Sequence, residues 1–103
     1  MISPHFSVAV CPICGAGLCG IRICGLDTPK PYGLVVCDEC EAIWTQPDIL
    51  TAHQYPDDTE NPLCPISGAP LWGPNSRWAH REDVQRLGWC DSIDSELSIE
   101  PGS

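Results

Sequence analysis

The sequence predicts a small, metal-stabilised, β-rich (α+β) fold, on two observations. Cys11–Cys14 and Cys37–Cys40 are Cys-x-x-Cys pairs whose separation along the chain suits one tetrahedral metal ion. The 103 residues also include 11 prolines and nine glycines, a composition typical of short strands joined by many turns. A domain of this length is only marginally stable without a metal or disulfides, so the paired cysteines are the natural stabilising element.

The first element is a short strand that leads into the first cysteine pair. Residues 5–10 are apolar and partly β-branched, as a strand requires. Pro12 favours a tight turn between Cys11 and Cys14, and Gly15 can adopt the positive φ that turns backbone amides toward the thiolates. We therefore expect a metal-binding knuckle at the end of this strand.

Two longer strands and a third short one follow. Residues 18–24 alternate loosely between apolar and other positions, and residues 32–37 form a second apolar run. Residues 25–31 between them have turn chemistry throughout, which predicts a hairpin. Residues 42–44 form a third strand after Cys40. The hairpin would carry the second cysteine pair back to the first.

Together these motifs resemble the zinc-ribbon (zinc-β-ribbon) group. The resemblance covers about residues 8–45 and implies three short antiparallel strands with a four-cysteine zinc site. Glu41 departs from the pattern, since such ribbons often carry glycine after the second knuckle. The motif is shared by proteins of many different functions, so it predicts a fold and a metal but no particular activity.

Four thiolates around one ion leave no position for water, which predicts a structural Zn²⁺ held by Cys11, Cys14, Cys37 and Cys40. Two other interpretations stay open. One is a rubredoxin-like iron site, although the second pair lacks the proline and glycine typical of rubredoxins. The other is a thiol-redox function of the cysteine pairs.

The remaining chain divides by composition. Residues 1–54 comprise the ribbon and a helical turn over residues 47–53, for which Pro47 suits the first position and Asp48 the helix start. Residues 55–62 are rich in proline and acidic residues and predict a linker.

The next segment, residues 63–93, repeats part of the first. Residues 64–71 read CPISGAPL and residues 11–18 read CPICGAGL. The alignment that places Cys64 opposite Cys11 also places Cys90 opposite Cys37. Ser67 and Ile93 stand opposite the other two cysteines, Cys14 and Cys40. We interpret this segment as a degenerate second ribbon-like half that can pack on the first; chance similarity between two knuckles is the alternative.

A short helix near residues 79–88 interrupts the repeat. Val84 and Leu87 can share one face, Gly88 suits the helix end, and Trp89 can fold back onto Val84. Residues 94–103 are acidic and polar and predict a disordered tail.

The other four cysteines, Cys19, Cys24, Cys64 and Cys90, allow three interpretations. They can be inert buried thiols, since cysteine is among the most buried residue types. They can form a second metal site, or a Cys64–Cys90 pair left from the degenerate half. They can also be reactive or disulfide-forming thiols. His5, His53 and His80 are distant from the pairs in sequence and are expected to be surface or packing residues.

Charge and hydropathy limit the function classes. The net charge of −9 with only five basic residues argues against a broad phosphate-binding surface, so nucleic-acid binding is the weaker alternative. No apolar run approaches membrane-spanning length. The N-terminus lacks the pattern of a signal peptide, so we expect a cytoplasmic protein with reduced thiols.

These observations lead to a functional expectation. No catalytic set of side chains is visible in the sequence, so we expect a non-enzymatic module that binds a protein partner. The candidate contact residues are Trp72 and Trp78 with the neighbouring Arg77 and Arg81, because tryptophan and arginine often anchor protein interfaces.

Overall fold

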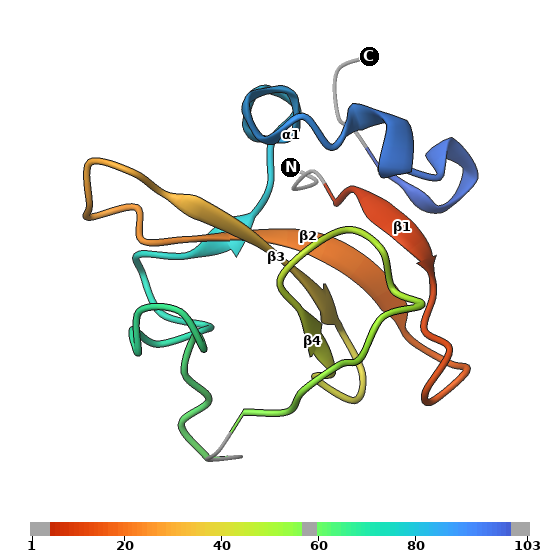
Figure 1. Ribbon diagram of the computed structural model, residues 1–103, viewed down its shortest axis with the longest axis horizontal. Helices are drawn as coiled ribbons and strands as arrows, with labels where there is room; N and C mark the ends of the chain where they lie inside the picture. Colours follow the sequence, from red (N-terminus) through yellow and green to blue (C-terminus); the bar gives the residue numbers. More distant parts are fainter. Residues whose placement is uncertain (1–4, 57–59, 100–103) are drawn as a thin grey trace.

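A computed structural model describes residues 5–56 and 60–99 and contains one five-stranded antiparallel sheet (Figure 1). The strand order is β1-β2-β3-β4, and β5 pairs with β2 beyond the end of β1. The strands are β1 (Ser7–Val10), β2 (Leu18–Cys24), β3 (Tyr32–Cys37), β4 (Ile43–Trp44) and β5 (Arg77–Trp78).

The β2–β3 hairpin is the centre of the sheet. Its register runs from the Cys19–Cys37 pair to the Cys24–Tyr32 pair. The bounds of both strands agree with the sequence prediction, and the short third strand forms as β4. The strand expected within residues 5–10 forms as β1 on the other edge of β2, whereas β5, which pairs with the same edge, was not predicted.

Both faces of this hairpin are covered, which explains why its strands are almost continuously apolar. On the first side, which we call the helix face, Ile21, Ile23 and Val84 share a core cluster with the partly buried Leu87 and Trp89. The packing is close at Gly33, where a Cβ atom would lie 2.5 Å from Cδ1 of Leu87.

We call the opposite side of the hairpin the knuckle face. Here Cys24, Leu34 and Val36 form a buried cluster with Cys64 and Leu71 from the second half of the chain. Residues 63–93 therefore contribute to the core on both faces of the N-terminal hairpin. In Figure 1, α1 lies above the sheet and residues 60–76 lie below it.

The helix predicted near residues 79–88 is confirmed as α1 (Arg81–Leu87). It begins after His80, whose backbone N–H donates to Oδ2 of Asp83 over 2.9 Å. It ends at Gly88, which has φ 75°. The N–H of Trp89 then donates to the carbonyl of Val84 over 3.1 Å, the expected return of the chain.

The helical turn predicted for residues 47–53 is wrong. The segment is a turn in which the backbone N–H of Leu50 donates to Oδ1 of Asp48 over 3.0 Å. Asp48 thus bonds its own local backbone, a competition with helix formation that is typical of aspartate. The indole of Trp44 donates to the carbonyl of Thr51 over 3.1 Å and holds the turn against β4.

The structural similarity between the two repeated segments is limited to the first knuckle. Gly68 has φ 76°, and its N–H donates to the carbonyl of Cys64 over 2.8 Å, as Gly15 does to Cys11 over 3.0 Å. The counterpart of the second knuckle does not form, because Cys90–Ser92 is a 3-10 turn (η1).

Residues 94–99 are not a solvated tail. They contain a second 3-10 turn, Ser95–Leu97 (η2), and the backbones of Ile99 and His5 exchange two hydrogen bonds of 2.8 Å. Residues 100–103 of the predicted tail and residues 57–59 of the predicted linker lie outside the described residues. Within the described ranges, no helix has the length and apolar character needed to cross a membrane.

Candidate metal centre

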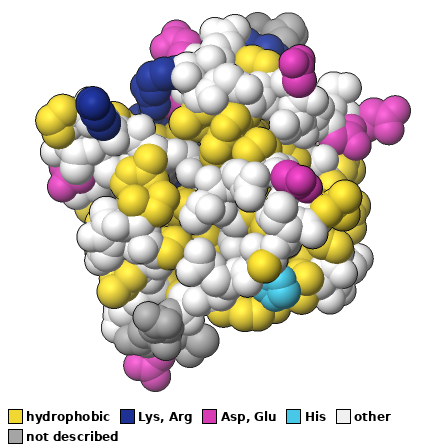
Figure 2. All heavy atoms as spheres, viewed as in Figure 1, with side chains coloured by type: hydrophobic (Ala, Val, Ile, Leu, Met, Phe, Trp, Pro, Cys, Tyr) yellow, Lys and Arg dark blue, Asp and Glu magenta, His cyan; other side chains and the backbone are white. Residues whose placement is uncertain are grey.

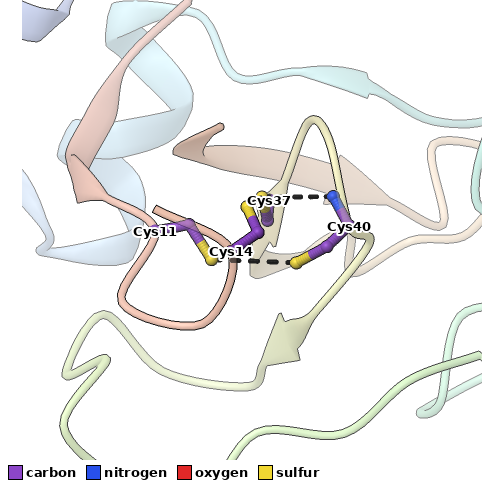
Figure 3. Close-up of side chains that lie close together, drawn as sticks. All are labelled: Cys11, Cys14, Cys37 and Cys40. Carbon is purple, nitrogen blue, oxygen red and sulfur yellow. Dashed lines mark hydrogen bonds between the residues drawn. The ribbon is translucent and has the colours of Figure 1, made fainter. Parts of the chain in front are cut away.

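Four cysteine side chains from two turns converge at one end of the hairpin (Figure 3). Cys11 and Cys14 come from the β1–β2 loop, whereas Cys37 is the last residue of β3 and Cys40 lies in the β3–β4 turn. Their Sγ atoms all lie within 4.8 Å of one another. The Sγ atoms of Cys11 and Cys40 are 3.7 Å apart, and those of Cys14 and Cys37 are 3.6 Å apart. This cluster is positioned to bind a metal ion.

The two turns have the same backbone arrangement. The N–H of Gly15 donates to the carbonyl of Cys11 over 3.0 Å, and the N–H of Glu41 donates to the carbonyl of Cys37 over 3.2 Å. Gly15 has φ 70° and Glu41 has φ 63°. Glu41 therefore adopts the left-handed conformation that glycine provides in the first knuckle, and the departure from the ribbon pattern leaves the knuckle geometry intact.

Backbone amides point at the sulfur atoms in both knuckles. The N–H of Ile13 donates to Sγ of Cys11 and that of Gly17 to Sγ of Cys14; the amides of Glu39 and Cys40 both donate to Sγ of Cys37. Each of these bonds measures 3.4 Å. Such bonds stabilise thiolates and orient them for a metal ion.

The electrostatic environment differs between the ligands. Backbone amides of Ala16 and Gly17 lower the pKa of the Cys14 thiol to about 6, and this residue is exposed. Burial is the main cause that raises the pKa of Cys37 to about 12, against the lowering effect of the amides of Cys40 and Glu39. A bound cation would stabilise the thiolate form of both residues, since a coordinated thiol is deprotonated.

The donor set fits zinc. Four cysteine sulfurs supplied by two tight turns are a donor set found in structural zinc sites. Cys11 and Cys37 are buried in the same cluster as Val35, Ala42 and Trp44. An ion at this position would thus fasten the β1–β2 loop to the β3–β4 turn over part of the core.

The second metal site that the sequence left open as one interpretation is not assembled. Among the described residues, the only group of three or more His, Cys, Asp or Glu ligand atoms is the four-cysteine cluster. The Cys64–Cys90 pair, which the sequence left open as one interpretation, does not form, because Cys90 is exposed in η1 and Cys64 instead contacts Cys24 on the knuckle face. Cys19 is a buried thiol that packs with Cys11 and Cys37, and burial raises its pKa.

Sequence reasoning missed the role of Arg22. This residue lies on the knuckle face and is only 7% exposed. Its guanidinium donates to the carbonyl of Leu71 over 3.1 Å and to Oγ of Ser76 over 3.0 Å. It also lies over the rings of Trp72 and Trp78, at 4.5 Å and 5.0 Å from their centroids. In the sequence, this role could have been found from the presence of a charged residue in the middle of an apolar strand.

The other residues that we expected to contact a protein partner interact with residues of the same chain. Trp78 is half-buried, and its ring is 4.5 Å from that of His5. Arg77 forms an ion pair of 2.9 Å with Asp83, and Arg81 lies over the ring of Phe6 at 5.5 Å.

The three histidines have packing or capping roles. His5 packs at a tilt against Trp78, with an angle of 57° between the ring planes, and His80 precedes α1. His53 lies 5.8 Å from Trp44 and 5.1 Å from Tyr55, measured between ring centroids. The four-cysteine group contains no histidine.

Comparison of the chain with protein-family models, curated proteins and solved structures found no match. The functional conclusions therefore depend on the arrangement of the residues themselves.

Proposed function

We propose that this chain is a structural zinc-binding module of the zinc-ribbon type, without enzymatic activity, whose surface binds a protein partner. The observation that carries the proposal is the convergence of four cysteine sulfurs within 4.8 Å in two matching knuckles. β2 and β3, which connect these knuckles, and β4, which follows the second knuckle, support the resemblance to zinc ribbons.

A structural role follows from the number of ligands. Zinc is four-coordinate in structural sites, so four thiolates occupy every position and none is open to water or substrate. Metal binding would contribute to folding, by roughly 10–16 kcal/mol apparent in small zinc modules. This contribution matters in a chain of 103 residues whose core is limited by its size.

The partner surface that we propose is centred on Trp72. This residue is 41% exposed, and with Leu63 it lines a hollow of about 280 Å³ whose walls include Pro62 and Pro70. Exposed tryptophan beside an apolar hollow is typical of protein-binding surfaces. Arg22 lies against the Trp72 ring, which limits the conformational entropy lost on binding.

The contacts of the basic residues argue against the nucleic-acid alternative. Arg22 is buried, and both Arg77 and Arg86 are paired with Asp83. On the face shown in Figure 2, Lys and Arg side chains lie only along the upper edge. A phosphate-binding surface needs clustered, available cations.

The test of the metal assignment is elemental analysis of the purified protein, followed by Co²⁺ titration of the metal-free chain. We expect one zinc per chain and the absorption bands of a tetrahedral cobalt–thiolate site. The Cys11→Ser and Cys40→Ser variants should lose stoichiometric metal, whereas the matched Cys90→Ser variant should keep it. A red, iron-loaded protein would instead support the rubredoxin-like alternative.

The partner surface is tested separately, by affinity capture with zinc-loaded protein. Trp72→Ser and Leu63→Ser should lose a protein that the wild type retains. Leu50→Ser is the matched control, because Leu50 is 91% exposed and does not line the hollow. Equal retention by all variants would place the surface elsewhere. Tight binding of DNA or RNA that weakens steeply with added salt would favour the nucleic-acid alternative.

A further inference from the structure

Two cysteines outside the metal centre have sulfur atoms in unusually close contact. Sγ of Cys24 and Sγ of Cys64 are 2.6 Å apart in the structure, where both thiols are free. The residues are buried, at 0% and 1% exposure. In the metal centre, by comparison, the sulfur pairs are separated by 3.6 Å and 3.7 Å, distances that leave room for a shared ion. The Cys24–Cys64 contact is too short for such an ion.

We propose that Cys24 and Cys64 form an intramolecular disulfide by thiol–disulfide exchange with a low-molecular-weight disulfide of the glutathione class. The bond would fasten the Cys64 knuckle to the end of β2. This site is independent of the zinc-binding function, since neither residue belongs to the four-cysteine group.

The surroundings favour a covalent bond over a second metal. The sulfurs lie in a cluster with Leu34, Ile43 and Leu71, which supplies no further thiolate or imidazole ligand. Their chain positions are far apart, whereas their side chains meet in the core, so the bond needs no rearrangement of β2. Burial also raises the pKa of the Cys24 thiol, which makes it a poor metal ligand and suits it to react second and not first.

The position of a neighbouring hollow assigns different roles to the two residues. Cys64 lines a hollow of about 210 Å³ together with Gln54, Tyr55 and Leu63, whereas Cys24 does not line it. A small disulfide can therefore approach Cys64 first. Cys64 is the attacking residue, and Cys24 is the resolving residue.

The exchange balances in two steps. The Cys64 thiolate attacks one sulfur of the oxidant RSSR, which forms a mixed disulfide on Cys64 and releases one RS⁻. The Cys24 thiolate then attacks Sγ of Cys64, which forms the Cys24–Cys64 bond and releases the second RS⁻. The two protons lost by the cysteines are taken up by the released thiolates. The protein dithiol is oxidised by two electrons, and the oxidant is reduced to two RSH.

The main test maps the bond by mass spectrometry. Zinc-loaded protein carrying Cys90→Ser, which removes the exposed thiol outside the metal centre, is incubated with oxidised glutathione, denatured, alkylated and digested. Trypsin alone would leave both cysteines on residues 23–77, so a protease that cleaves after Glu39 and Glu60 is added. We expect residues 23–39 and 61–77 to be linked, with Cys24 joined to Cys64. Alkylation of both residues, or a link through Cys37 instead, would overturn the proposal.

Single variants test the order of attack. In the same background, Cys24→Ser should accumulate glutathione on Cys64, because the resolving thiol is absent. Cys64→Ser should leave Cys24 unmodified. Glutathione on Cys24 in the Cys64→Ser variant would overturn the assignment of roles. Zinc content and circular dichroism confirm that each variant is folded.

Thermal unfolding supplies a readout that does not depend on the single variants. The midpoint of the oxidised parent protein should fall when a phosphine reductant is added at saturating zinc. The Cys24→Ala/Cys64→Ala double variant should show no such fall. An equal response of both proteins to the reductant would contradict the proposed bond.

Discussion

The indole of Trp72 donates a hydrogen bond to Oε2 of Glu41 over 3.0 Å, and it thereby joins the second metal knuckle to the second half of the chain. Glu41 is the non-glycine residue with positive φ among the described residues, at 63°. A left-handed conformation costs a residue with a Cβ about 1–2 kcal/mol. The side-chain bond to Trp72 offsets part of that cost.

Substitution of Glu41 separates these two effects. Glu41→Ala keeps the backbone strain but loses the bond, and we expect it to reduce the free energy of unfolding by about 1 kcal/mol. Glu41→Gly loses the same bond but removes the strain, so it should be more stable than Glu41→Ala by about 1 kcal/mol. Denaturant unfolding at saturating zinc measures the difference. An alanine variant as stable as the glycine variant would show that the knuckle is unstrained.

The buried hydrogen bonds of Arg22 lead us to expect that even a conservative substitution there lowers the free energy of unfolding. Lysine cannot reproduce both guanidinium bonds, to the carbonyl of Leu71 and to Oγ of Ser76. We expect Arg22→Lys to lower the free energy of unfolding by about 2 kcal/mol, the scale of buried hydrogen bonds from a charged donor. Exposed Lys30 provides the control, since Lys30→Gln should change stability by less than about 0.5 kcal/mol. Equal effects at the two positions would rule out the buried role of Arg22.

Asp83 is the buried centre of a small charge network. It accepts hydrogen bonds from the backbone N–H of His80 and from the guanidinium groups of Arg77 and Arg86. Burial alone would raise its pKa, but these bonds and charges hold the pKa below its ordinary value. Because both arginines are partly exposed, solvent screens the ion pairs.

We therefore expect Asp83→Asn to cost about 2 kcal/mol near neutral pH, chiefly through the capping bond and the unpaired arginines. Glu82→Gln removes the same charge from the exposed neighbouring position and should cost less than about 1 kcal/mol. Chemical denaturation of the two zinc-loaded variants makes the comparison. If the neighbouring substitution costs as much, the effect is one of net charge and not of the network.

His5 predicts a pH dependence of stability. Burial lowers its pKa from 6.5, although the charge of Asp38 and a backbone hydrogen bond act in the opposite direction. Among the described residues, its buried Nε2 atom has no hydrogen-bond partner, and its ring packs at a tilt against that of Trp78. As the pH falls below the unfolded-state pKa, the unfolded chain therefore binds a proton more readily than the folded chain, which favours unfolding.

His5→Phe retains an aromatic ring and removes the titrating group. Between about pH 7.5 and about pH 5.5 the wild type should lose more stability than this variant. Urea midpoints measured at the same zinc concentration give the comparison, since any effect of pH on the metal centre is then common to both proteins. Parallel pH curves for the two proteins would show that His5 does not titrate in this range.

Local patterns were sufficient for much of the fold. The bounds of β2 and β3, the helix after His80 and the four clustered cysteines could be predicted because each depends on spacing within a short stretch of chain. The turn at Asp48 was mispredicted as a helix for a related reason, since aspartate suits either structure and the hydrogen bond to Leu50 decides between them.

Other relationships depend on residues that are distant in sequence. Cys64 has the same knuckle motif as Cys11, yet its sulfur meets Cys24 on the knuckle face and not a second knuckle. The pairing of β5 with β2 and the position of Arg22 between two tryptophans also arise only when the second half covers the hairpin.

The sequence by itself determined the two knuckles, the hairpin between them and the donor set suited to a metal ion. These features follow from backbone preferences and ligand chemistry over a few residues. Only the tertiary structure decided which of the remaining thiols come into contact and which charges are buried. The reason is that the hairpin has two apolar faces, and it was the packing of residues 63–93 against both that selected Cys24 as the neighbour of Cys64.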